Sequence, residues 1–248
     1  SSPSCRPGCT WKSKLPAIGD LSILGSAAAL CRNQRDRGIL LARHRFIDRK
    51  REGIHMNNPP KILAFAGSTR TDSYNKKLVK LAMLGAEAAG AEATFIDLRD
   101  LPMPLYDGDL EEQEGLGENA LAFKSLLLGH QGLLIASPEY NSSISAVLKN
   151  AIDWASRPAE GEAPLACFKG KACSLMSASP GALGGLRGLA TVRSILGNIG
   201  VIVLPDQVAV SKAHEAFDPN GKLIDAKHQQ SIEALGANVA HLLFRLVD

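Results

Sequence analysis

The sequence lacks the features that mark membrane and metal-binding proteins. Its 248 residues contain no run of the roughly 18 apolar residues that a membrane span needs. The six histidines show no HxxxH or HxxE spacing, and Cys5 and Cys9 have no matching Cys or His pair downstream, which argues against zinc. Cys167 and Cys173 are expected to be ordinary buried thiols. We therefore expect a soluble, cytoplasmic protein without a metal site.

Two common nucleotide-binding motifs are also missing. In the stretch GSTRTDSYN, residues 67–75, Gly67 is followed by neither a second Gly nor a Lys at the offset that a triphosphate loop requires. The stretch also lacks the second and third glycines of the dinucleotide fingerprint, although Asp97 ends the next predicted strand, where a ribose-binding acid belongs. Neither a triphosphate nor a pyrophosphate is expected there.

The basic charge of the chain is confined to its first segment. Residues 1–55 carry 11 Lys and Arg against 4 Asp and Glu, whereas residues 56–248 carry 17 against 21. The first segment has no sustained periodicity, its apolar stretch is too short for a signal peptide, and it is richer in acids than a transit peptide. We interpret it as a disordered N-terminal extension, which is non-native sequence ahead of Met56, a targeting segment or an interaction arm. No nucleic-acid partner is inferred from it.

Apolar strands alternate with amphipathic helices through the rest of the chain. The predicted strands are 61–67, 91–98, 132–137, 171–178 and 201–205, and the predicted helices are 75–90, 117–130, 145–157, 186–200 and 226–246. This alternation predicts one α/β domain over residues 56–248, with a doubly wound, five-stranded parallel sheet. Ligands of such sheets bind beyond the carboxyl ends of the strands, at the switch in strand order.

The first candidate loop is GSTRTDSYN itself. It offers short hydroxyl donors and the charge of Arg70, and Asn75 lies near a helix start, where free N–H groups and the helix dipole favour an anion. Such a loop suits a terminal monophosphate. The simpler alternative is helix capping by Ser73 or Asn75.

The second and third candidate loops suit a flat ring. In SPEYNSS, residues 137–143, the backbone of 139–141 can face a polar ring edge and Tyr140 can stack on a ring. The alternative is a turn in which Asn141 or Ser143 caps the next helix. SASPGALGGLRG, residues 177–188, has four glycines, which indicates backbone passing closely beside something; the alternative is a flexible surface loop.

Together, GSTR with SYN, SPEYN with LKNAIDW, and PGALGGLRG resemble the NAD(P)H-dependent FMN reductases, which include flavodoxin-like quinone, chromate and azo-dye reductases. The resemblance covers residues 61 to about 246. It implies a flavodoxin-like fold with three α/β/α layers, FMN as the cofactor, NADPH or NADH as the co-substrate, and a homodimer or homotetramer.

The resemblance also implies a set of site residues. The FMN phosphate would be held by Ser68, Arg70, Ser73 and Asn75, the ring and ribityl chain by Pro138, Glu139, Tyr140 and Asn141, and the other side of the flavin by Ser179, Gly181 and Gly184. Tyr106 would lie near the ring or a dimer contact. We expect Arg187 to bind the NADPH phosphate or to form a subunit contact.

One departure from the family pattern stands out. Relatives usually read IPG before VLKNAIDW, whereas this chain has Ile144, Ser145 and Ala146. The change is expected to reshape the start of that helix beside the nicotinamide pocket.

The chemistry implied by the resemblance needs no catalytic acid or base. A hydride passes from nicotinamide to flavin N5, and electrons then pass to quinones, azo compounds, chromate or free flavin. Two other classes of function stay open at this point. One is a flavodoxin-like electron carrier without nicotinamide turnover, and the other is a non-catalytic ligand-binding domain.

Overall fold

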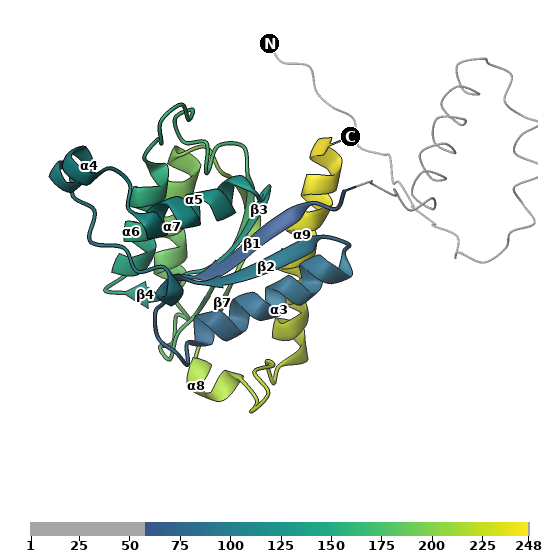
Figure 1. Cartoon of the computed structure of the whole chain (residues 1–248). Coiled ribbons are helices and arrows are strands. Elements are labelled where there is room, and N and C mark those ends of the chain that lie inside the picture. The colour runs from purple at the N-terminus through teal and green to yellow at the C-terminus, as the bar shows by residue number, and fades with distance from the viewer. Residues whose placement is uncertain (1–57, 248) are drawn as a thin grey trace, which may run out of the picture. The chain divides into compact units, whose positions relative to one another are not determined.

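The five predicted strands form one parallel sheet in a computed structural model, which describes residues 58–247 (Figure 1). The strands are β1 (Lys61–Ala66), β2 (Glu92–Asp97), β3 (Gly132–Ala136), β6 (Ala172–Ala178) and β7 (Ile202–Val210), and their order is β2-β1-β3-β6-β7. This is the flavodoxin-type order, with the switch point between β1 and β3. The predicted fold class is therefore confirmed, while the predicted extension over residues 1–55 lies outside the described residues.

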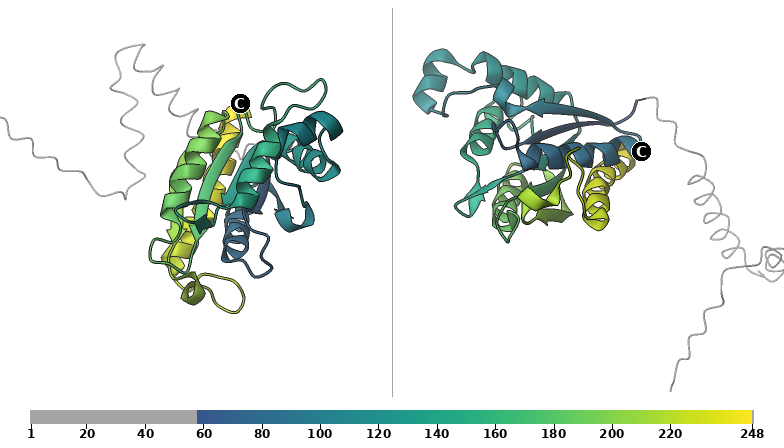
Figure 2. Two further views of the ribbon diagram at one scale, coloured as in Figure 1. Left: turned by 90° about the vertical axis from the view of Figure 1, so that its left-hand side faces the viewer. Right: turned by 90° about the horizontal axis from the view of Figure 1, so that it is seen from below.

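Helices cover both faces of the sheet and give three layers (Figures 1 and 2). Helices α3 (Tyr74–Ala88) and α9 (Ala226–Val247) pack on one face, and α5 (Glu118–Leu128), α6 (Ala146–Ser156) and α7 (Leu186–Asn198) pack on the other. Every residue of β3 and β6 is buried. This explains why these strands are continuous apolar or small-residue runs rather than alternating ones.

Helices α3 and α9 pack with their backbones in close contact. A Cβ added at Gly85 of α3 would lie 1.9 Å from the carbonyl oxygen of Glu233, and one added at Gly236 of α9 would lie 1.8 Å from the carbonyl oxygen of Ala82. The two glycines therefore permit backbone contact between the helices. This contact packs the second half of α3 against α9.

The last strand is longer than predicted. The sequence predicts a strand over 201–205, but β7 continues through Pro205 to Val210, with a shift in register between Cys173 and Leu175 of the neighbouring strand. Pro205 has no N–H group to donate to a neighbouring strand. It is tolerated because β7 is the edge strand, where one side of the backbone needs no partner.

Several short elements were not predicted. They are η2 (Leu98–Asp100), α4 (Gly108–Glu114), β4 (Glu139–Tyr140), β5 (Ser143–Ile144) and α8 (Ala213–Ala216). Each is too short for hydrophobic periodicity to reveal it. All of them lie in connections, and β4 and β5 fall within a predicted ligand loop.

Two further sequence expectations concern burial. Cys167 and Cys173 are free and buried, as predicted, and burial raises the pKa of both thiols. Between residues 58 and 247, no helix has both the length and the apolar character that crossing a bilayer requires.

Candidate functional site

Three loops meet at the carboxyl edge of the sheet. We call them loop A (67–73, after β1), loop B (137–145, after β3) and loop C (179–185, after β6). Each begins with a hydrogen bond to the neighbouring strand: Gly67 N to Ala136 O at 2.9 Å, Ser137 N to Met176 O at 2.9 Å, and Ser179 N to Val210 O at 3.0 Å. The prediction that these stretches follow the strands of one edge is confirmed.

The start of helix α3, at the end of loop A, has no side-chain cap. Ser73 occupies the N-cap position with extended backbone, but within residues 58–247 neither its hydroxyl nor any other side chain accepts a hydrogen bond from the first turn. The alternative in which Ser73 or Asn75 only caps the helix is therefore wrong. The first-turn N–H groups of α3 keep their capacity to bind an anion.

Asn75 follows loop A, and its side-chain amide binds the backbone of β6 rather than the loop. Its Nδ2 donates to Ala178 O at 2.8 Å, and Ala178 N donates to its Oδ1 at 2.9 Å. The side chain is buried, with 3% exposure of the residue. Asn75 thus ties the start of α3 to the end of β6 with both polar atoms of its side chain.

Two arginines lie at loop A. Arg70 is exposed and its N–H donates to Ser68 Oγ at 3.2 Å. Arg99 of η2, which was not among the predicted site residues, donates from Nη1 to the hydroxyl of Thr71. Because β1 and β2 are parallel neighbours, the segments that follow them lie side by side. A sequence prediction that used this strand order would have placed Arg99 next to loop A.

Asp97 does not serve as a free ribose-binding acid. Its Oδ2 lies 2.5 Å from Nζ of Lys76, whose side chain is 8% exposed, and its Oδ1 accepts from Arg99 N at 3.0 Å. These contacts account for both carboxylate oxygens. They agree with the absence of a dinucleotide fingerprint in loop A.

Loop B folds back on itself as a hairpin. Strands β4 and β5 pair antiparallel, with Glu139 opposite Ile144 and Tyr140 opposite Ser143. Asn141 and Ser142 form the two-residue turn with positive φ values of 51° and 67°, as in a type I′ turn.

The side chains of the hairpin differ in exposure. Pro138 is buried at the base of the hairpin, whereas Asn141 is exposed at its tip. Tyr140 is 60% exposed. An aromatic face is therefore available beside the sheet edge.

The cap of helix α6 differs from both predicted alternatives. Neither Asn141 nor Ser143 caps the helix; Ser145 does, because its Oγ accepts from Leu148 N at 3.3 Å. The same hydroxyl donates to Gly67 O at 2.6 Å. Ser145, which stands where the pattern expected from the resemblance has a Pro, therefore caps α6 and binds loop A.

Glu139 joins loop B to the start of α7. Its Oε2 accepts from Arg187 N at 2.9 Å and from Gly188 N at 3.1 Å, and its Oε1 lies 2.6 Å from Nη2 of Arg187. Burial alone would raise the pKa of this carboxyl, but the bonds from Gly188 and Arg187 outweigh it and lower the pKa. The carboxylate of Glu139, rather than a residue of loop C, caps α7.

The glycines of loop C are required by close contact with the protein itself. Gly184 has a φ of 62°, and a Cβ there would lie 2.8 Å from backbone atoms of residues 209–211. Gly185 has a φ of 96°, and its Cβ would lie 1.9 Å from Ser177 Oγ. The prediction that backbone passes closely beside something is confirmed, and the neighbours found are β6 and β7.

The outer part of loop C is more open. Ser179 is partly exposed, and its Oγ accepts from Gly181 N at 3.2 Å. Gly181 is exposed, and a Cβ there would meet only Ser179 Oγ, at 3.7 Å. This part of the loop is accessible to a ligand, whereas Gly184 is buried against β7.

The segment 101–107 is held on helix α6. Pro104 O accepts from Trp154 Nε1 and from Asn150 Nδ2, both at 2.8 Å, and Tyr106 N donates to Asn150 Oδ1 at 2.8 Å. Tyr106 packs edge-on against Trp154 with ring centroids 5.1 Å apart. Its hydroxyl donates to Glu111 Oε2 at 2.8 Å, and this bond is the main reason that the pKa of Tyr106 is raised. Trp154 is 2% exposed and belongs to the core.

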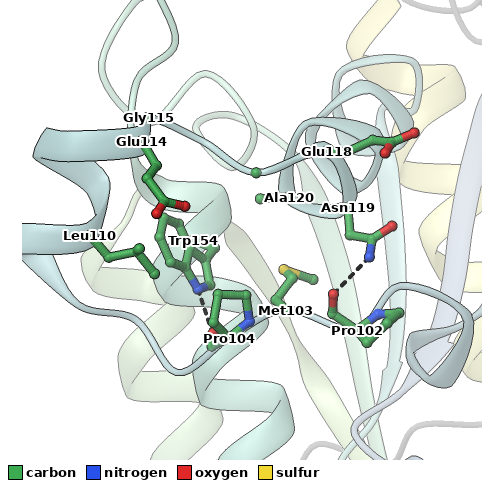
Figure 3. Close-up of a pocket in the computed structure, with 11 residues that line it drawn as sticks. Pro102, Met103, Pro104, Leu110, Glu114, Gly115, Glu118, Asn119, Ala120 and Trp154 are labelled. Atoms are coloured by element: carbon green, nitrogen blue, oxygen red, sulfur yellow. Dashed lines mark hydrogen bonds between the residues drawn. The ribbon is translucent and has the colours of Figure 1, made fainter.

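A cavity of about 220 Å³ adjoins this segment, and Figure 3 shows the residues that line it. Its walls come from the segment itself, α4, the start of α5 and α6, and include Met103, Leu110, Asn119 and Trp154. A second cavity of about 200 Å³ borders loop A at Thr69. Both are smaller than the 300–1,000 Å³ of typical ligand sites. Neither cavity is lined by a residue of loop B or loop C, so neither is the candidate site.

Comparisons with known proteins agree with this geometry. A family model described as NADPH-dependent FMN reductase matches residues 60–215. An NAD(P)H-dependent FMN reductase of Pseudomonas aeruginosa is 35% identical over 179 residues, which cover 72% of this chain and 92% of the relative. A 2-hydroxy-1,4-benzoquinone reductase of a Burkholderia species is 34% identical over 165 residues, covering 66% and 85%.

One solved structure extends the likeness to three dimensions. The flavoenzyme NAD(P)H:(acceptor) oxidoreductase of Paracoccus denitrificans superposes with a TM-score of 0.63 at 27% identity. The superposition covers 75% of this chain and 98% of that one. The likeness therefore includes the whole three-layer fold of the solved protein.

Proposed function

Because the chain belongs to the NADPH-dependent FMN reductase family, and is thus an FMN-dependent NAD(P)H oxidoreductase, we propose that the start of α3 binds the FMN phosphate. One observation carries this assignment. Three helices directly follow loops A, B and C: α6 is capped by Ser145 and α7 by Glu139, whereas α3 has no side-chain cap. A phosphate at α3 would accept its first-turn N–H groups and gain from the helix dipole.

The side chains of loop A suit a phosphate. Ser68 and Ser73 are nearly buried, with 8% and 5% exposure, and their hydroxyls add short donors to the loop. Arg70 is exposed and brings a positive charge to the same loop. For Asn75 we propose an indirect role, because both of its polar atoms already bind Ala178. Asn75 would hold the loop in place rather than contact the phosphate.

We assign the flavin ring to the space between the loop B hairpin and the open part of loop C. The exposed face of Tyr140 and the backbone of Pro138 and Asn141 would bound one side, and Ser179 and Gly181 the other. Bound FMN supplies the chemistry by accepting a hydride and passing electrons on. The chain contributes placement: it fixes the rings, and no acid or base is needed. Gly184 would not contact the flavin; it would hold loop C in place by packing the loop against β7.

The donor and the acceptor enter from the exposed side. The Arg187 side chain lies next to the hairpin and is 57% exposed. We assign its guanidinium to a phosphate of NADPH. The relatives named as quinone reductases favour a quinone as acceptor, with azo compounds, chromate and free flavin as further candidates. Tyr106 would lie along the acceptor side.

The protein would be cytoplasmic and would act as a homodimer or homotetramer. Its kinetics would be ping-pong, because the donor and the acceptor use the same face of the flavin in turn.

A visible spectrum of the purified protein tests this proposal. We expect flavin absorbance, bleaching on anaerobic addition of NADPH or NADH, and recovery on addition of a benzoquinone. A protein that stays colourless after FMN is added would overturn the proposal. A flavin that binds but is not reduced by either nicotinamide would instead indicate an electron carrier.

A further inference from the structure

Glu139 makes more contacts across the site than any other predicted side chain. One carboxylate oxygen accepts from two backbone N–H groups of α7, at 2.9 Å and 3.1 Å, and the other accepts from Arg187 Nε at 2.8 Å and lies 2.6 Å from its Nη2. The Glu139 side chain is only 7% exposed, whereas that of Arg187 is 57% exposed. The carboxylate is therefore an internal anchor and the guanidinium is the accessible group.

The glycines of PGALGGLRG make room for this anchor. A Cβ at Gly188 would lie 3.3 Å from Glu139 Cβ and 3.2 Å from Ser143 O, and a Cβ at Gly185 would lie 3.6 Å from Glu139 Cβ. The hairpin of loop B thus rests directly on the first turn of α7. The two motifs SPEYN and GGLRG form one unit through Glu139.

The anchor also orients the guanidinium. Glu139 binds its Nε and Nη2, and within residues 58–247 no partner binds Nη1. A planar guanidinium fixed along one edge presents its remaining N–H groups in a defined direction, which suits recognition of a phosphate oxygen. At the same time the carboxylate occupies the N–H groups at the start of α7. A phosphate approaching there would meet Arg187 rather than the helix backbone.

We propose that Glu139 is a positioning residue for the nicotinamide donor, and that it acts through Arg187 to favour NADPH over NADH. This inference rests on the proposed function of the site. The phosphate that distinguishes NADPH would be read by a guanidinium held in one orientation by the Glu139 carboxylate. Without that carboxylate, Arg187 keeps its charge but loses its fixed direction.

The test uses Glu139→Gln in the FMN-loaded enzyme. Glutamine keeps the shape and an oxygen that can accept from Arg187 N and Gly188 N, but its amide carries no charge to hold the guanidinium. We expect KM for NADPH to rise about tenfold, the scale of one charge-assisted contact. KM for NADH should change by less than about twofold, and kcat should stay near the wild-type value. A protein in which Glu139 were only structural would lose FMN or melt at lower temperature without a change in the NADPH to NADH ratio.

Two further variants make the test decisive. Arg187→Gln should reproduce the rise in KM for NADPH, and the double variant should be no worse than either single one, because both act through one contact. Asp153→Asn is the matched control: it neutralises a carboxylate paired with Lys149 on the surface of α6 at 2.8 Å, and should leave both KM values unchanged. Effects of Glu139→Gln and Arg187→Gln that add, or an unchanged donor preference in Glu139→Gln, would overturn the inference. Wild-type enzyme that oxidises neither donor would overturn the proposed function instead.

Discussion

The side chain of Asn75 pairs with the backbone of Ala178 through two hydrogen bonds, of 2.8 Å and 2.9 Å. The pair joins the start of α3 to the last residue of β6, across the strand β3 that lies between β1 and β6 in the sheet. It therefore connects loop A, where the phosphate is assigned, with loop C, where the ring is assigned. A buried contact of this kind presets the distance between two parts of one cofactor site.

Replacing Asn75 should weaken both the fold and the site. In Asn75→Ala the N–H and C=O groups of Ala178 lose their partners, and each unsatisfied buried group costs about 1–3 kcal/mol. We expect the free energy of unfolding of the apoprotein to fall by about 2–4 kcal/mol in urea denaturation. Asn75→Asp is the informative comparison, because it keeps an acceptor for Ala178 N but brings a negative charge toward the phosphate. Aspartate should therefore lose more FMN affinity than its loss of stability alone accounts for.

Arg70 should contribute to FMN affinity without contributing to stability. Its side chain is exposed, so Arg70→Ala should leave urea denaturation of the apoprotein nearly unchanged. FMN binding should weaken by about 1–3 kcal/mol through the loss of a charge-assisted contact. Fluorescence titration of the apoprotein with FMN at two salt concentrations measures this, and the difference between variant and wild type should shrink at the higher salt. An unchanged dissociation constant would mean that Arg70 faces solvent in the complex.

The sheet and its ligand loops could be predicted because their signals are local. The buried strands are apolar runs such as KILAFA and GLLIA, and the loops that follow them are marked by Ser, Pro and Gly. In a doubly wound sheet these loops must share one edge, whatever the details of packing. The family resemblance then rested on three loops in the right order.

The roles of individual side chains were less predictable because their partners are far away in sequence. Glu139 and Arg187 are 48 residues apart, and Asn75 and Ala178 are 103 apart. Nothing near Glu139 indicates that it caps a helix, since a capping residue normally precedes its own helix. The hairpin turn at Asn141 and Ser142 was also missed, because positive φ is most often marked by Gly and neither residue is one.

Residues 1–55 should be dispensable for the reaction. The family match begins at residue 60, and the candidate site is formed entirely by residues within 58–247. A chain that starts at Met56 should bind the same amount of FMN and reduce a benzoquinone with NADPH at the wild-type rate. Flavin absorbance per protein and steady-state turnover measure the two quantities. A drop in either would assign a structural role to the extension.

A buried lysine away from the site should control stability at neutral pH. Nζ of Lys124 lies 2.6 Å from Glu162 Oε2 and 2.6 Å from Arg157 O, and also contacts Ala155 O, so its ammonium group binds carbonyls at the end of α6. The side chains of Lys124 and Glu162 are 4% and 13% exposed. Lys124→Met should lower the free energy of unfolding by about 3–5 kcal/mol, because it leaves the carboxylate buried without its partner. Lys149→Met, which breaks an exposed pair with Asp153, should cost less than about 1 kcal/mol.

The same pair predicts a pH dependence of known sign. Burial alone would raise the pKa of Glu162, but the bonds from Lys124 and Ala159 N outweigh it, and the pKa lies below its ordinary value of 4.5. A carboxyl with a lowered folded pKa stabilises the wild-type protein fully above pH 4.5, and this contribution is lost as the pH falls through the lowered pKa. In Lys124→Met burial dominates and the sign reverses, so the unpaired carboxylate destabilises the variant most at neutral pH. The difference in unfolding free energy between wild type and variant should therefore narrow steadily from pH 7 into the acid range. A difference that stays constant with pH would show that packing of the lysine chain, rather than its charge, stabilises this part of the fold.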